Sequence, residues 1–346
     1  MLPLQSTEFA ATLKITALTF RALRLLSDGQ FRSGTALARE LGVSRTSVWT
    51  ALQGLEDAGV PLMRLPARGY RLSAPIDWLD AQRIARHLGR YGDVYQVQVA
   101  DMLESTNTTL LGQAAKGAPS GLVLAAEMQT QGRGRRGRTW HSGLGGTLTF
   151  SALWRFEQGA GVLAGLSSAI GVALIRGLHE LGVSEAMLKW PNDVLVRHHK
   201  IAGTLVEIQG DVLGPSAAII GIGMNFRLDE VTRERIDQAV TDLVSVGAPP
   251  DRNKVIGQLL SQLGNVLETF AVRGFAPLRK EWERHHAYAG KSVTMRLPDG
   301  STEAGIVAGV EDDGALLLQT AHGLRRFHSG EVSMRAADVW PSMNTR

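Results

Sequence analysis

Residues 121–140, GLVLAAEMQTQGRGRRGRTW, join an apolar run to a loop rich in glycine and arginine. The run 121–126 predicts a buried strand, because a short continuous apolar segment bounded by polar residues is typical of one. In the Gly/Arg loop (residues 132–138), three glycines allow tight folding and close approach to a ligand. Its four arginines match carboxylates and phosphates. Trp140 follows with a flat ring on which a purine can stack. The stretch predicts a strand that ends in a loop for a small anion carrying an aromatic base, such as a nucleotide.

A run of glycine and arginine is also typical of flexible RNA-binding tails, and composition alone leaves both interpretations open. The position of the run favours the ligand loop. It lies in mid-chain between the apolar segments 122–124 and 147–150, whereas a disordered arm is not normally embedded in a core.

The composition indicates an ordinary globular protein with a sizeable core. The 346 residues are 44% hydrophobic and 20% charged, which leaves room for two or three domains. The chain has no cysteine, which excludes disulfides, thiolate metal sites and a thiol nucleophile. No apolar run is long enough to span a bilayer. We therefore expect a cytoplasmic protein with no membrane partner.

The first 74 residues predict a winged helix-turn-helix module. Apolar spacing predicts helices over 19–26, 35–41 and 45–58, and residues 62–72 predict a short β-hairpin. In such a module the third helix enters the major groove of DNA and the hairpin touches phosphates. The alternative is a small helical packing domain with solvated arginines. Trp49 is interpreted as a partly buried anchor rather than a base reader. The expected DNA-binding residues are Arg45, Thr46, Ser47, Thr50 and Arg68.

Further polar motifs follow in the middle of the chain. Ser105, Thr106 and Asn107 suit a polar ring in a small ligand, although such a trio is also an ordinary helix cap. The run 189–193, KWPND, clusters a lysine, an amide and a carboxylate around a proline. His198 and His199 are interpreted as a solvated turn because no third metal ligand is evident. The remaining motifs are KIAG at 200–203 and GIGMN at 221–225, where Gly221 and Gly223 in a predicted strand allow close backbone approach.

Together these five motifs closely resemble those of biotin–protein ligases, in the family's order and approximate spacing. The resemblance covers nearly the whole chain, and the N-terminal module matches the bifunctional bacterial type that also represses the biotin operon. It implies an α+β multidomain fold with three parts. These are a winged helix-turn-helix domain with its lead-in (1–74), a class II synthetase-like α/β catalytic domain (75–288) and an SH3-like C-terminal β-barrel (289–346).

The resemblance implies a two-step reaction. The biotin carboxylate attacks the α-phosphate of ATP and gives biotinyl-5′-AMP, and a lysine of an acceptor then takes the biotinyl group as an amide. Lys200 and Arg135 would be catalytic. Arg133 and Arg135 would order the loop over the adenylate, and Asp193 would hold Mg²⁺. The implied biotin-binding residues are Ser105, Thr106, Asn107, Gln129, Arg133, Gly134, Arg135, Lys200, Gly221 and Gly223. The implied nucleotide-binding residues are Arg138, Trp140, Lys189, Asn192, Asp193, Asn225 and, with Glu331 as a weaker companion, Arg335.

The implied substrates and cofactors are biotin, ATP and Mg²⁺. The implied partners are the biotin carboxyl carrier protein of acetyl-CoA carboxylase, biotin operator DNA and a second copy of the chain when the adenylate is bound. Three alternatives stay open: a lipoate–protein ligase, a biotin-sensing repressor with little ligase activity, and a ligase whose winged module no longer represses.

Overall fold

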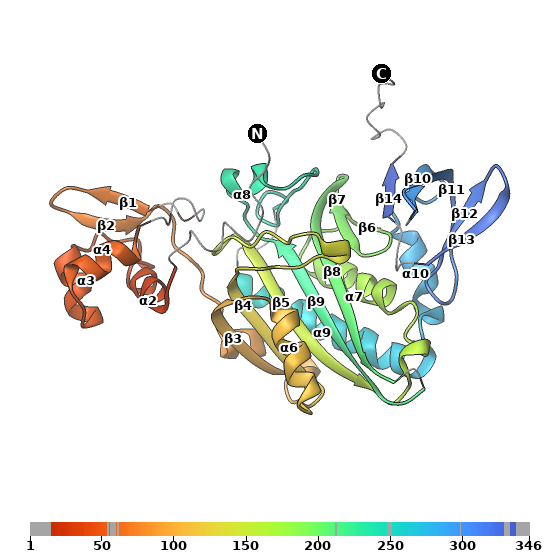
Figure 1. Cartoon of the computed structure of the whole chain (residues 1–346), viewed down its shortest axis with the longest axis horizontal. Coiled ribbons are helices and arrows are strands. Elements are labelled where there is room, and N and C mark those ends of the chain that lie inside the picture. The colour runs from red at the N-terminus through yellow and green to blue at the C-terminus, as the bar shows by residue number, and fades with distance from the viewer. Residues whose placement is uncertain are drawn as a thin grey trace, which may run out of the picture.

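The computed structural model describes residues 15–53, 55, 60, 62–211, 213–247, 251–297, 299–328 and 333–336. An N-terminal module lies at one end of the molecule, a central sheet with its helices occupies the middle, and a smaller sheet lies at the other end (Figure 1). Among the described helices, none combines the length and the apolar composition that crossing a bilayer requires.

The N-terminal module has the predicted winged helix-turn-helix order. Its elements are α2 (Ala17–Leu25), α3 (Gly34–Leu41), α4 (Arg45–Ala51), β1 (Leu62–Leu65) and β2 (Gly69–Leu72). Gly42 ends α3 in the left-handed conformation, and the Ser44 hydroxyl accepts from the Ser47 N–H to begin α4. Leu37, Val48 and Leu52 are fully buried between the helices.

Two expectations for this module are wrong in detail. The third helix was expected to run to residue 58, but α4 ends at Ala51, where Leu52 caps it; residues 54 and 56–59 lie outside the described part of the chain. Trp49 was expected to be partly buried, yet 49% of it is exposed. Helix periodicity explains this, since Val48 and Ala51 occupy the buried face and Trp49 lies beside them on the outer one.

The central sheet has seven strands in the order β3-β4-β5-β9-β8-β7-β6. Strands β3 and β4 run parallel, and the other neighbouring pairs are antiparallel. The strands are β3 (Gln96–Leu103), β4 (Leu122–Gln129), β5 (Thr147–Phe156), β6 (Ala186–Lys189), β7 (Asp193–Val196), β8 (His199–Gly210) and β9 (Ser216–Asn225).

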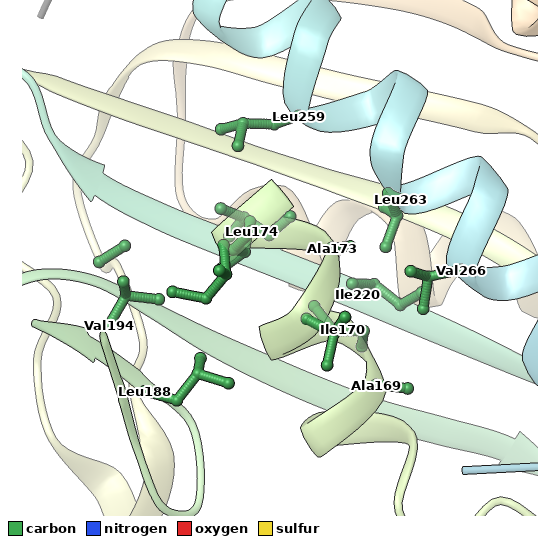
Figure 2. Close-up of a cluster of buried hydrophobic side chains, with 14 of the residues drawn as sticks. Ala169, Ile170, Ala173, Leu174, Leu188, Val194, Ile220, Leu259, Leu263 and Val266 are labelled. Atoms are coloured by element: carbon green, nitrogen blue, oxygen red, sulfur yellow. The ribbon is translucent and has the colours of Figure 1, made fainter. Parts of the chain in front are cut away.

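Helices cover the sheet unequally. Helices α7 (Leu166–Glu180) and α9 (Arg252–Arg273) pack together on one face, where Ile170, Leu174 and Ile220 meet Leu263 in the main core (Figure 2). Helix α6 (Thr106–Ala115) lies on the opposite face against β5 and β9, with a smaller apolar cluster beneath it (Figure 1). The rest of that opposite face is therefore free to form a site. Shorter helices are α5 (Ala81–Ala85), α8 (Glu230–Glu234) and α10 (Arg279–Arg284), with 3-10 turns at Gly89–Tyr91, Arg135–Gly137, Ala160–Val162 and Ala276–Leu278.

A buried ion pair ties the segment after the N-terminal module to the central sheet. Arg252 and Glu127 are 1% and 0% exposed, with Nη1 of Arg252 2.7 Å from Oε2 of Glu127. The same carboxylate accepts from the Leu79 N–H at 2.5 Å, and Arg252 also donates to the backbone oxygens of Asp77 and Thr147. Charges this deep persist only when they are paired and hydrogen-bonded, so this contact fixes the chain at residues 77–79.

The C-terminal sheet has five antiparallel strands in the order β13-β12-β11-β10-β14. Between described residues, the edge strands β13 and β14 are not paired with each other, so the sheet is not closed into the expected SH3-like barrel. The indole N–H of Trp190 donates to the Gly314 carbonyl at 3.1 Å and links this sheet to the central one. The strands are β10 (Ser292–Arg296), β11 (Thr302–Val310), β12 (Leu316–Thr320), β13 (Gly323–Phe327) and β14 (Ser333–Ala336).

Candidate active site

A cavity of about 130 Å³ lies on the open face of the central sheet, beneath the Gly/Arg loop. A single bound water needs only ~10–15 Å³ on this scale, so the cavity is large enough for an organic ligand. Its floor is set by strand register, with Ser151 of β5 opposite Gly221 of β9 and Thr149 opposite Gly223. Since side chains alternate along a strand, these four positions share one face.

The two floor glycines leave room that no other residue would leave. A Cβ at Gly221 would lie 2.2 Å from Oδ1 of Asn107, and one at Gly223 would lie 2.4 Å from Cε2 of Trp140. Both positions were predicted from sequence as points of close backbone approach. The structure identifies what approaches them: an amide from α6 and an indole that follows the loop.

The start of α6 forms one wall. Ser105 caps the helix by accepting from the Thr108 N–H, so the cap interpretation of this trio holds. Thr106 and Asn107 also line the cavity, so the ligand interpretation is compatible with the cap. The Thr106 N–H donates to Oε1 of Gln129 at 2.7 Å, and the Ser151 hydroxyl lies 2.7 Å from Oγ1 of Thr106 and 2.6 Å from Oδ1 of Asn107.

The Gly/Arg loop is a small closed hairpin over the cavity. The Gly134 N–H donates to the Arg138 carbonyl at 2.7 Å, and the Trp140 N–H donates to the Gly132 carbonyl at 2.8 Å. Arg136 has a positive φ of 58°, a conformation that non-glycine residues adopt rarely. The cavity wall includes Arg133, Gly134, Arg135, Arg136, Arg138 and Trp140.

Positive charge gathers at the centre of the cavity. Nζ of Lys200 lies 2.7 Å from Oδ1 of Asp193, with the two side chains 13% and 14% exposed. The same ammonium lies 5.7 Å from the centre of the Trp140 ring. Burial lowers the pKa of Arg135, and its neighbours Arg138 and Arg136 act in the same direction while Asp193 opposes them. Several cations and one carboxylate in a partly dry site favour an anionic ligand.

The other expected nucleotide-binding residues lie nearby. Lys189 lines the cavity. The Asn192 amide donates to the Thr204 carbonyl at 2.7 Å, and the Asn225 amide donates to the carbonyls of Lys200 and Thr241 at 3.2 and 3.0 Å. Asn225 therefore fixes the backbone at Lys200.

The C-terminal sheet also reaches the cavity, because Met334 of β14 lines it. The neighbouring Arg335 pairs through its backbone with Thr294, and its side chain is outside the described part of the structure, as is Glu331.

The expected DNA-binding residues form a separate group in the N-terminal module. Arg45, Thr46 and Thr50 are exposed on α4, whereas Ser47 is half-buried, with its hydroxyl 2.8 Å from that of Ser44. Arg68 lies in the hairpin turn, with its guanidinium 4.8 Å from the centre of the Phe31 ring. None of the described residues of this module lines the cavity above.

The described residues of the cavity offer few ligands for a metal ion. Of the described residues that line it, Asp193 is the one carboxylate. The part of the chain that the structure describes holds no group of three or more His, Cys, Asp or Glu residues arranged for a metal. A divalent ion here would therefore take most of its ligands from nucleotide phosphates and water, as Mg²⁺ usually does.

Two residues of the site were missed from sequence. Ser151 joins Thr106 and Asn107, and Glu207 of β8 accepts from both Asn107 and Arg133. Neither gave a distinct local signal, because each is one of several polar residues in its strand.

Known proteins share this architecture. The profile of the Biotin/lipoate A/B protein ligase family matches residues 99–225, that of the biotin protein ligase C-terminal domain matches 288–335, and that of an HTH domain matches 19–71. The bifunctional ligase/repressor BirA of Salmonella typhimurium is 36% identical over 94% of this chain and 100% of its own length. That of Bacillus subtilis is 30% identical over 89% of this chain and 95% of its own.

A solved structure agrees with these relatives. The biotin protein ligase of Aquifex aeolicus in complex with biotin and ATP superposes with a TM-score of 0.61 at 30% identity, over 70% of this chain and 99% of that one.

Proposed function

The chain belongs to the biotin–protein ligase family, in its bifunctional ligase/repressor branch, and from this premise we propose how its residues carry out the reaction. It is a biotin–protein ligase that uses biotin and ATP. The observation that carries the residue assignments is the nearly buried Lys200 beneath the arginine loop, in a cavity with a glycine floor.

In the first step, a biotin carboxylate oxygen attacks the α-phosphorus of ATP and pyrophosphate leaves with the electrons of the broken P–O bond. Two anions must meet, so cations already in place lower the barrier. Lys200 stabilises the charge that develops between carboxylate and α-phosphate, and Arg135 assists from the loop. Arg138 and Lys189 bind phosphate oxygens, Trp140 stacks on adenine, and Asn192, Asn225 and Arg335 complete the nucleotide site.

Biotin lies against the start of α6 and the glycine floor. Ser105, Thr106, Asn107 and Gln129 supply hydrogen bonds for its ring, in keeping with their place in one hydrogen-bonded wall. Gly221 and Gly223 let Asn107 and Trp140 lie close to the sheet at the floor of the biotin site, while Arg133 and Gly134 close the top. A pocket that hydrogen-bonds a polar ring discriminates strongly against analogues without those groups, and a lipoyl chain lacks them.

Bound ATP would bring Mg²⁺ into the site. Asp193 is the protein carboxylate that would hold it, and the ion would supply charge neutralisation at the phosphates when bound. The Lys200–Asp193 ion pair holds the two side chains together at the point where carboxylate and phosphate meet.

In the second step, the acceptor is a lysine of a biotin carboxyl carrier protein. Its neutral amine attacks the carbonyl carbon of the mixed anhydride, AMP leaves, and the amine loses a proton to give the amide. No covalent enzyme intermediate is required, which accords with a chain that has no cysteine. The closed Gly/Arg loop protects the anhydride from water until the carrier binds.

For repression, the winged module binds operator DNA. Arg45, Thr46, Ser47 and Thr50 face the major groove, and Arg68 contacts phosphates beside it. Biotinyl-adenylate promotes a homodimer, which presents two modules to a two-fold-related operator. The corresponding domain boundaries are 1–74, 75–288 and 289–346.

Two assays with the full-length chain test this function. In the first assay, the chain is incubated with ATP, biotin and a purified carrier domain. It should attach biotin to that domain, which is detected as an increase in the mass of the domain. A gel-shift with the chain's own biotin-operon DNA should show binding that biotin plus ATP strengthens. Carrier biotinylation without any operator binding would identify a ligase that no longer represses, and the reverse result would identify a repressor with little ligase activity.

A further inference from the structure

We propose that Glu207 of β8 is a positioning residue for biotin binding and adenylate retention, acting through Asn107 and Arg133 rather than on the reacting atoms. The inference rests on the proposed ligase function and adds a residue to it. The carboxylate oxygen Oε2 of Glu207 accepts two hydrogen bonds, from the Asn107 amide at 2.7 Å and from the Arg133 guanidinium at 2.8 Å. One atom therefore joins the ring-binding wall to the loop that covers it.

The first contact decides which way the Asn107 amide faces. Its nitrogen donates to Glu207 and to the Leu205 carbonyl at 3.2 Å, and both of these groups only accept. Both of its N–H donors are thus used, and the amide oxygen is turned toward the Ser151 hydroxyl and over Gly221. Asn107 is 4% exposed, so water cannot easily replace these partners. The orientation gives the cavity a fixed acceptor, which an N–H of a cyclic urea requires.

The second contact holds the loop. Arg133 begins the Gly/Arg hairpin, where a backbone bridge pairs it with Thr139. Glu207 is 25% and Arg133 42% exposed, so the pair is partly shielded at the edge of the cavity. A charge-assisted hydrogen bond is stronger than a neutral one, and this one fastens the hairpin to a rigid strand. We call the Arg133–Glu207 pair the latch.

The latch belongs to a continuous polar chain. It runs from Arg133 through Glu207, Asn107, Ser151 and Thr106 to Gln129. Gln129 ends β4 and Arg133 begins the hairpin, so the chain links the two ends of residues 129–133 around the cavity. Lys200 and Asp193 lie outside it, paired with each other. Glu207 should therefore affect the affinity for biotin and the residence time of the adenylate more than the rate of the chemical step.

The test is Glu207→Gln, which keeps an oxygen for Asn107 but removes the charge that holds Arg133. We expect the KM for biotin and the release rate of biotinyl-adenylate each to rise about tenfold, with kcat for adenylation within about twofold of wild type. Raising the salt concentration should speed release from the wild type and change it little in the variant. Glu268→Gln, which breaks an exposed ion pair with Arg90 outside the cavity, is the matched control.

Arg133→Gln and the double variant Glu207→Gln/Arg133→Gln complete a double-mutant cycle. If the latch is one interaction, the double variant releases adenylate no faster than the faster of the two single variants. The proposal would be overturned if Glu207→Gln kept the wild-type KM for biotin and the wild-type release rate of adenylate. It would also be overturned if the effects of the two substitutions on the release rate multiplied in the double variant. Should Glu207→Gln not fold, normal adenylate retention by Arg133→Gln would overturn it equally. A wild-type chain that forms no adenylate would instead refute the ligase function itself.

Discussion

Lys200 and Asp193 form an ion pair inside the cavity, with Nζ of the lysine 2.7 Å from Oδ1 of the aspartate. Both side chains are nearly buried, and the lysine also faces the Trp140 ring. A lysine held in this way is fixed in position by its carboxylate partner. It is therefore ready to stabilise negative charge without reorganisation, which is the condition for electrostatic catalysis.

Lys200→Ala should reduce adenylate formation by about 10²- to 10³-fold, the usual loss when a donor to developing charge is removed. It should also lower the melting temperature, because Asp193 is left nearly buried without its partner. Adenylate formation is measured by pyrophosphate release, with the exposed Lys280→Ala as control. Combining Lys200→Met with Asp193→Asn should recover thermal stability but not activity. A folded Lys200→Ala protein with near-normal adenylation would remove the assigned role.

Gly221→Ala should raise the KM for biotin at least about tenfold, since the added Cβ would lie 2.2 Å from Oδ1 of Asn107 and must displace it. The matched control is Gly112→Ala on the exposed side of α6, where nothing lies within 4 Å of the new Cβ. That change should leave KM unaltered and stabilise the protein by about 0.4–1 kcal/mol. Steady-state kinetics and thermal melts distinguish the two, and equal KM values in both variants would contradict the packing argument.

Arg45→Ala should weaken operator binding roughly tenfold and leave adenylate formation intact, because Arg45 is exposed and lies in a module whose described residues do not line the cavity. Gel-shift titration and pyrophosphate release on the same preparation measure the two activities. A parallel loss of both would refute separable modules.

His286 should make the protein sensitive to acid. Burial lowers its pKa to about 3, whereas an unfolded histidine titrates near 6.5. Below pH ~6.5, His286 therefore binds a proton in the unfolded chain but not in the folded one. The free energy of unfolding falls as the pH drops from ~6.5 toward 3, by up to about 1.4 kcal/mol per pH unit.

His286→Phe retains an aromatic ring against Trp282, which stacks on the imidazole at 4.6 Å, and removes the titration. Its melting temperature should fall less than that of the wild type between pH 7 and pH 5. Equal losses would show that His286 does not govern this range.

Local patterns predicted much of the architecture and the site. Glycine in a strand marks close backbone approach, and Gly221 and Gly223 do lie under Asn107 and Trp140. Helix periodicity and capping residues placed α3 and α4 to within a few residues at their starts.

Contacts between distant parts of the chain were beyond such patterns. From the sequence, Glu207 is expected to be a solvent-facing strand residue. Its partners Asn107 and Arg133 lie 100 and 74 residues away in sequence. Ser151 reaches Asn107 across 44 residues. Barrel closure in the C-terminal sheet was assigned by resemblance, and it depends on edge pairing that no local signal reports.

The most direct measurement of the central claim is mass spectrometry of the acyl-adenylate after incubation with ATP, Mg²⁺ and either biotin or lipoate. We expect biotinyl-adenylate from biotin and no lipoyl-adenylate from lipoate. Lipoyl-adenylate alone would keep the mechanism and overturn the substrate. A folded sample that makes neither would contradict the ligase function and leave the winged module as the functional part of the chain.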